Sequence, residues 1–245
     1  MKMIARAACF AAMSLLAFNA AGAQERSANR DGFTLMPGKA KIVLFRPTIT
    51  VGEQSTGGLA EPNADWTQQA RTNIGAALAA TQGALGNEVV AYEEPLGTEA
   101  GLAAEYRSLF TSVADAVIVY KLFPGNRLPT KKRAGVFDWT LGPGLRTLPG
   151  MADADYALFI FTEDQYGSAG RKVAQLLFAM AGGAMTSGVH RGYAGLIDVK
   201  TGNLVWFNAD PMMGGDVRTN DGAQRRVAQL LQGFPGRPAV NGPTK

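Results

Sequence analysis

The residues that could carry out chemistry are few, and His190, the single histidine of the chain, limits them most. A Ser-His-Asp arrangement would have to use His190 as its base, and a histidine-based metal site would contain only one imidazole. Nothing in the sequence places a nucleophile, this base and an orienting group together. We therefore expect no catalytic residue, no metal and no other cofactor.

Paired carboxylates are the second candidate for acid–base chemistry. Asp153 and Asp155 stand at the start of an apolar run, and Glu163 and Asp164 stand at its end. An extended strand of about eight residues separates the two pairs by roughly 25 Å. The pairs cannot share one site on a straight strand, so we expect solvated carboxylates at the two strand ends. A ligand-binding protein or hydrolase that uses His190 with Glu163 and Asp164 remains the alternative.

The stretch Gly-Ser-Ala-Gly-Arg-Lys at residues 167–172 resembles a phosphate-binding loop at first sight. The Walker motif places four residues between its glycines and a Ser or Thr after its lysine, whereas here two residues separate the glycines and no hydroxyl residue follows. The stretch also differs from the G-x-S-x-G motif of hydrolases, because Tyr166 occupies the first glycine position. A helix that begins near Ser168 could still hold an anion at its free N–H groups.

A basic cluster beside aromatic residues offers a different kind of site. Lys131, Lys132 and Arg133 precede Trp139 in residues 123–151, a loop rich in proline and glycine. Such a cluster can contact an anionic lipid, a glycan or a nucleic acid. It can also be a solvated loop that packs its tryptophan onto the body, and three basic residues are fewer than a typical basic tract contains. The expected interaction surface combines this loop with Arg171 and the glycines at residues 182–183.

The first residues and the composition indicate an exported protein. The chain has 245 residues, of which 47% are hydrophobic and 18% charged, as is typical of a globular domain. Residues 1–23 have the basic start, apolar run and small-residue end of a signal peptide, which predicts cleavage after Ala23 and a periplasmic protein. The single cysteine, Cys9, lies too early for lipid attachment and would be removed, leaving neither a disulfide nor a lipid anchor.

The charge of the mature chain argues against nucleic acid as a partner. The signal peptide contains Lys2 and Arg6 and no acidic residue, so 22 of the 24 basic residues remain against 20 acidic ones. That balance is too near neutrality to indicate nucleic-acid binding.

The hydrophobic periodicity predicts one α/β domain over residues 41–234, between a flexible lead-in at 24–40 and a disordered tail at 235–245. Alternation of strands and helices is typical of a single mixed sheet flanked by helices. Pro47 is expected to end the first strand, with a loop over residues 51–63. The predicted strands span residues 41–49, 88–94 and 155–162, and the predicted helices span residues 65–85, 98–117 and 220–231. Residues 116–122 fit either a continuation of the second helix or a strand.

Two helical segments carry expectations about burial. Residues 167–188 predict a buried or interfacial helix that breaks at Gly182-Gly183, and residues 173–185 could contact a membrane although they are too short to span one. In the last helix, the side chains expected inward are Ala223, Val227, Leu230 and Leu231, and those expected outward are Arg225 and Arg226.

Residues 193–199 and 204–208 predict a β-hairpin. Gly202 can adopt the positive φ that a short hairpin loop requires. Asp198 can accept hydrogen bonds from N–H groups of the turn. Trp206 follows on the returning strand, where a large ring covers its cross-strand neighbours. We expect all three residues to be structural.

Three segments together resemble a bacterial envelope superfamily: Ala-Asp-Trp-Thr-Gln-Gln-Ala at residues 64–70, Ala-Asp-Tyr-Ala-Leu-Phe-Ile at 154–160, and Gly-Leu-Ile-Asp-Val-Lys-Thr-Gly-Asn-Leu-Val-Trp at 195–206. This superfamily includes the curli secretion lipoproteins, the penicillin-binding-protein activator lipoproteins and the N-terminal domain of the Tol-system protein. The resemblance implies a compact α/β domain that binds proteins or assembles in the envelope without catalysis.

The chain departs from this superfamily in two respects. It has no cysteine after the apolar run for lipidation, and its insertions at residues 123–151 and 165–190 lack the alternating ~10-residue segments of a membrane pore. We therefore expect a periplasmic protein that acts by interaction with envelope proteins or by assembly, including with its own copies. A membrane-assembled secretion component remains a second alternative.

Overall fold

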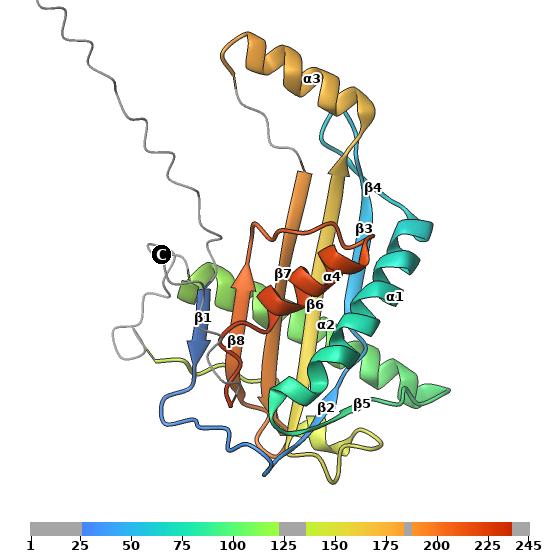
Figure 1. The fold of residues 1–245 in the computed structure, drawn as a ribbon. Coiled ribbons are helices and arrows are strands. Elements are labelled where there is room, and N and C mark those ends of the chain that lie inside the picture. Colours follow the sequence, from blue (N-terminus) through green and yellow to red (C-terminus); the bar gives the residue numbers. More distant parts are fainter. Residues whose placement is uncertain (1–25, 123–135, 184–187, 237–245) are drawn as a thin grey trace, which may run out of the picture.

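The computed structural model describes residues 26–122, 136–183 and 188–236. One mixed sheet organises them, and strand β6 (Tyr156–Gly167) lies at its centre (Figure 1). Along one side, β6 pairs antiparallel with β7 (Gly188–Asp198), which pairs in turn with β8 (Leu204–Asp210). Along its other side, β6 pairs in parallel with two successive strands, β2 (Lys41–Leu44) near its start and β3 (Thr48–Gln54) near its end. The predicted mixed α/β sheet is thereby confirmed.

The chain between residues 41 and 62 forms more strand than the sequence predicted. Pro47 lies between β2 and β3, where its missing N–H interrupts the hydrogen-bonded ladder. The chain then resumes as β3, whose Ile49 and Val51 are buried, and turns into the short strand β4 (Ala60–Pro62). The prediction of a loop over residues 51–63 was wrong, because the glycine and threonine content concealed a strand with alternate buried positions.

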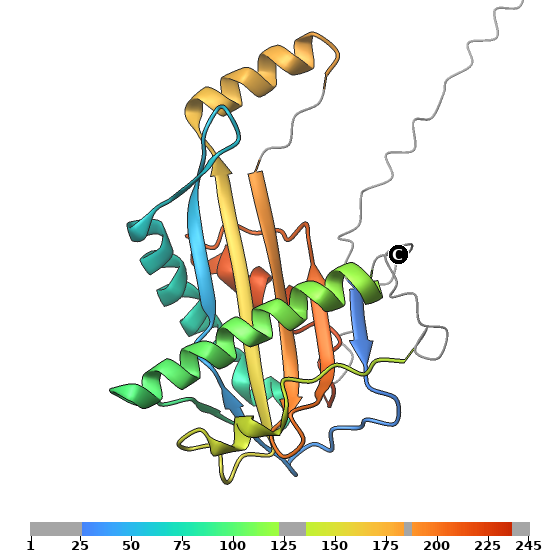
Figure 2. The same cartoon turned by 180° about the vertical axis from the view of Figure 1, so that it is seen from behind.

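Helices cover both faces of the sheet (Figures 1 and 2). Helix α1 (Ala64–Thr81) and helix α4 (Asn220–Leu230) lie on one face, and helix α2 (Thr98–Val117) crosses the other. Asn63 caps α1 by accepting a hydrogen bond from the backbone N–H of Trp66 at 2.9 Å. Two apolar cores result, one under α1 and α4 and one under α2. The remaining elements are β5 (Glu88–Ala91) and the short helical segments Gln82–Leu85, Ile118–Leu122 and Pro143–Thr147.

Two further segments settle points that concern the ends of elements. Residues 118–122 continue α2 as a π-helical turn, so the helical interpretation of this apolar run holds and the strand does not. Residues 26–29 form an edge strand, β1 (Arg26–Asn29), paired antiparallel with β8. A wholly flexible lead-in at 24–40 is therefore corrected, because unpaired backbone groups of β8 bind this polar segment. The predicted signal peptide and most of the predicted tail lie outside the described residues.

The β7–β8 hairpin places its three singled-out residues in the turn and the core. Asp198 accepts hydrogen bonds at 2.8 Å from the backbone N–H of Thr201 and at 2.9 Å from its hydroxyl. Gly202 has φ +72°, and a Cβ atom there would lie 1.8 Å from the carbonyl oxygen of Gly142. Trp206 is fully buried in the core under α1 and α4. The turn thus requires glycine for both its φ and its close backbone contact.

Candidate functional site

Helix α3 (Ala169–Met180) lies across the end of the sheet, beyond the last residues of β6 and apart from the other helices (Figures 1 and 2). Ser168 caps the helix by accepting a hydrogen bond from the N–H of Arg171 at 3.1 Å. Arg171 is only 7% exposed and donates to the carbonyl oxygen of Ser55, in the turn between β3 and β4, at 3.4 Å. The N-terminal part of α3 is therefore fixed to the body, and Arg171 is directed inward.

The opposite side of α3 is an uncovered apolar surface, which we call the α3 stripe. Its residues Val173, Leu176, Leu177 and Met180 are 59%, 62%, 60% and 77% exposed. They recur at i, i+3, i+4 and i+7, so at 100° per residue they share one face, roughly opposite Arg171. The helix ends before Gly182, which has φ +80°. The prediction of a buried helix is wrong, because no described element covers this face, whereas the interfacial interpretation agrees with it.

Five exposed large hydrophobic side chains on one short helix are unusual, since scattered exposed leucines are normal but a contiguous patch marks a contact surface. Phe178, which is 53% exposed, is the fifth, and its ring packs near Gly183, where a Cβ atom would meet it at 2.6 Å. Among the helices of the described ranges, α3 included, none is long and apolar enough to cross a bilayer.

A buried ion pair holds together the other side of the same sheet end. Asp164 and Arg226 are both fully buried, and two guanidinium nitrogens each donate to a separate carboxylate oxygen at 2.7 Å. Arg226 also donates to the hydroxyl of Thr162 and to the carbonyl oxygens of Gly214 and Gly215. The expectations of an outward Arg226 and a solvated Asp164 were both wrong. Strand β6 continues past Thr162, and α4 turns Arg226 toward it, so each charge neutralises the other.

His190 joins this network through its Nδ1 atom, which lies 2.7 Å from Oδ1 of Asp164. The histidine side chain is 26% exposed, and its ring lies 5.0 Å from that of Tyr166. A histidine oriented by a carboxylate is one half of a hydrolytic triad. Within the described ranges, however, the only side-chain hydrogen bond of His190 is this one, and the carboxylate is already bound at both oxygens by Arg226. The arrangement resembles a structural clamp more closely than a proton relay.

A second charged cluster borders this network. Arg218 binds Asp216 through Nε at 2.9 Å and NH2 at 2.7 Å, and its guanidinium stacks 3.8 Å from the ring centre of Tyr166 and 4.4 Å from that of Trp66. The hydrogen bonds from Arg218 lower the pKa of Asp216 to about 2. Burial and the nearby carboxylates raise the pKa of Tyr166, whose hydroxyl accepts from the N–H of Val217. These contacts attach the loop before α4 to α1 and β6.

The other residues predicted to form a site are dispersed. Lys131, Lys132 and Arg133 lie outside the described residues, and Trp139 is half-buried against the core under α2. Glu163 pairs with Arg191 at 2.8 Å, and Asp155 accepts from the N–H of Lys41 at 2.8 Å at the far end of β6. The structure therefore brings His190 and Asp164 together but does not bring Arg171 or Trp139 to a shared surface.

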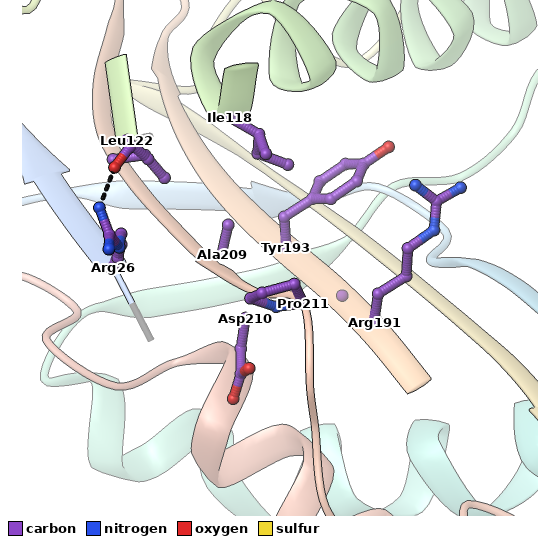
Figure 3. Close-up of a pocket in the computed structure, with 9 residues that line it drawn as sticks. Arg26, Ile118, Leu122, Arg191, Tyr193, Ala209, Asp210 and Pro211 are labelled. Atoms are coloured by element: carbon purple, nitrogen blue, oxygen red, sulfur yellow. Dashed lines mark hydrogen bonds between the residues drawn. The ribbon is translucent and has the colours of Figure 1, made fainter. Parts of the chain in front are cut away.

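A small cavity lies between β7, β8 and the turn at Ile118–Leu122 (Figure 3). Its volume is about 80 Å³, and Arg26, which donates to the carbonyl oxygen of Leu122, borders it. Asp210 contributes backbone to the wall, but its side chain points away from the cavity (Figure 3). Ligand pockets usually enclose about 300–1,000 Å³, so this space suits a few water molecules. Among the described residues, no group of three or more His, Cys, Asp or Glu could hold a metal ion.

Comparison with known proteins gives a limited result. The chain matches no protein-family model and no curated protein. Among solved structures it is similar to a PelC dodecamer from Paraburkholderia phytofirmans, at 14% identity and a TM-score of 0.36, over 85% of this chain and 97% of that one. A variant of that dodecamer in another space group gives the same identity and TM-score over 84% and 95% of the two chains. A likeness at this level carries no argument about what this chain does.

Proposed function

We propose that this chain is an exported, non-catalytic protein of the bacterial envelope that works by docking and assembly, and that it docks through the α3 stripe. The signal-peptide pattern of residues 1–23 and the resemblance to envelope proteins support the location. On this proposal its partners are envelope proteins, with further copies of the chain among them, and nucleic acid is not a partner.

The α3 stripe is the observation that carries the proposal. Leaving large apolar side chains in water costs roughly 1.5–3 kcal/mol for each one that could be fully buried. A helix of 12 residues that projects four of them from the end of the body does not stabilise the isolated chain. Its anchorage through Ser168 and Arg171 holds the stripe in a fixed orientation. A rigid and uncovered apolar face is what a docking surface requires.

Cell fractionation of the full-length chain tests this proposal. The variant with Leu176→Gln and Leu177→Gln removes the centre of the stripe without touching either core. The control variant carries Leu102→Gln and Leu109→Gln, two leucines of α2 that are 38% and 41% exposed. We expect the wild type and the control to co-sediment with the envelope fraction and the stripe variant to be released. Equal distribution of all three proteins would refute docking through α3.

The hydrogen bond between His190 and Asp164 favours one second candidate, a hydrolase or ligand-binding protein that uses His190. Replacing His190 by Ala distinguishes the two. A hydrolase would lose any ester or amide hydrolysis by the purified protein, whereas a docking protein would keep its envelope association unchanged.

A further inference from the structure

We infer that the α3 stripe docks onto a lipid bilayer that contains anionic phospholipid, with the helix lying in the plane of the membrane surface. This inference rests on the proposed function, because it names what the stripe contacts. Four observations favour lipid over a protein: the chemistry of the stripe, its area, the charges beside it and its place in the fold.

The stripe offers a partner nothing to hydrogen-bond. Protein–protein interfaces contain about one hydrogen bond per 100–200 Å². Between Lys172 and Gly183 the only side chain with hydrogen-bonding groups is Gln175, and helical geometry places it on the side away from the stripe. Hydrocarbon asks for no hydrogen bonds, so the stripe matches lipid better than it matches a protein surface.

The area of the stripe is small for a protein interface. The four side chains of the stripe and Phe178, each between 53% and 77% exposed, present roughly 300–500 Å². A stable protein complex needs about 800 Å² from each partner. An amphipathic helix at a membrane surface has no such minimum, because its apolar face sinks about 5–10 Å into the boundary between headgroups and acyl chains.

The charges around α3 complement an anionic surface. No acidic residue occurs between Asp164 and Asp198, a stretch that contains the whole of α3. Lys172 is exposed and follows the helix start on the flank of the stripe, where its ammonium can reach headgroups while the stripe is buried. Each Lys or Arg held near an anionic membrane contributes about 1 kcal/mol to binding. A basic flank beside an apolar face is typical of interfacial helices.

The placement of α3 also suits a flat partner. In both views the helix lies across the tip of the sheet, past the ends of β6 and β3 and away from α1, α2 and α4 (Figures 1 and 2). A planar bilayer can therefore meet the stripe without contacting the helical layers. Leu59, in the turn between β3 and β4 at the same end, is 73% exposed and can add to the contact.

Binding to vesicles tests the inference. The full-length chain is expressed, purified after export, and co-sedimented with vesicles of phosphatidylethanolamine and phosphatidylglycerol or with vesicles of phosphatidylcholine alone. We expect the wild type to bind the anionic vesicles, and the variant with Leu176→Gln and Leu177→Gln to bind them at least about tenfold more weakly. Lys172→Gln should weaken binding to the anionic vesicles about fivefold and leave binding to phosphatidylcholine unchanged.

Two controls make the result decisive. The α2 variant with Leu102→Gln and Leu109→Gln should bind within about twofold of the wild type, since it removes equally exposed leucines elsewhere. Every variant has the same N-terminus, so residues 1–23 cannot produce the difference even where some of them are retained. Equal vesicle binding by the wild type and the stripe variant would overturn the inference. If neither vesicle binds the wild type while stripe-dependent envelope association persists, the stripe binds protein, and only the proposed function survives.

Discussion

Replacing Arg226 by Met tests the buried ion pair most directly, because methionine keeps much of the side-chain volume and removes the charge. Asp164 is fully buried and loses both 2.7 Å hydrogen bonds, retaining only its contacts with His190 and Thr162. Breaking a buried pair by removing one partner costs about 3–5 kcal/mol. The carbonyl oxygens of Gly214 and Gly215 lose a donor as well, so we expect a loss of about 4 kcal/mol in the free energy of unfolding.

Urea unfolding at neutral pH, followed by far-UV circular dichroism, measures this loss, and Arg225→Met is the matched control. Arg225 is exposed and adjacent on the same helix, so its replacement should change stability by no more than about 0.5 kcal/mol. Adding Asp164→Asn to Arg226→Met should restore at least about 1 kcal/mol, because no unpaired charge is then buried. If Arg226→Met costs within about 1 kcal/mol of Arg225→Met, the charge on Arg226 does not stabilise this fold and the reasoning fails.

Three further predictions concern the turn and the loop before α4. Gly202→Ala should destabilise the protein by at least about 2 kcal/mol more than Gly32→Ala in thermal unfolding, since both have positive φ but only Gly202 has a carbonyl within 1.8 Å of the added atom. The pKa of Asp216 is lowered from 3.8 to about 2, so the unfolded state binds more protons in that window and stability falls as the pH falls through it; Asp216→Asn should flatten this part of a stability–pH curve. Tyr166→Phe leaves the N–H of Val217 without its acceptor and should cost about 1 kcal/mol by urea unfolding, whereas an unchanged midpoint would show that water replaces the hydroxyl.

The parts of the fold that follow from local signals could be predicted from the sequence. The hairpin is one, because Gly202 and Asp198 act within a few residues of their own position. The alternation of strands and helices indicated a mixed sheet for the same reason. Strand β3 escaped prediction since its pairing partner, β6, lies more than a hundred residues away and Pro47 suggested an end. Pairing over that distance overrides the local preference of a glycine-containing segment.

The candidate sites required information that composition hides. Arg226 follows Ala223 by three residues and precedes Leu230 by four, so the helical spacing itself placed it on the buried face. The general exposure of arginine outweighed this signal. Asp164 likewise shares the alternation of Leu158 and Ile160 once β6 is extended. Two opposite charges that each interrupt an apolar pattern are candidates for one buried pair. For α3, apolarity alone cannot distinguish burial in a core from exposure to a partner.

The pairing of β1 with β8 has a consequence for the order of folding. Residues 26–29 lie near the start of the chain and take positions beside residues 206–209 near its end. Contacts so distant in sequence slow folding, because the loop between them must close first. The edge of this sheet cannot be completed until nearly the whole polypeptide is available. A chain exported as its first 23 residues predict would therefore cross the membrane before its final tertiary structure could form, and would complete that structure only on the far side.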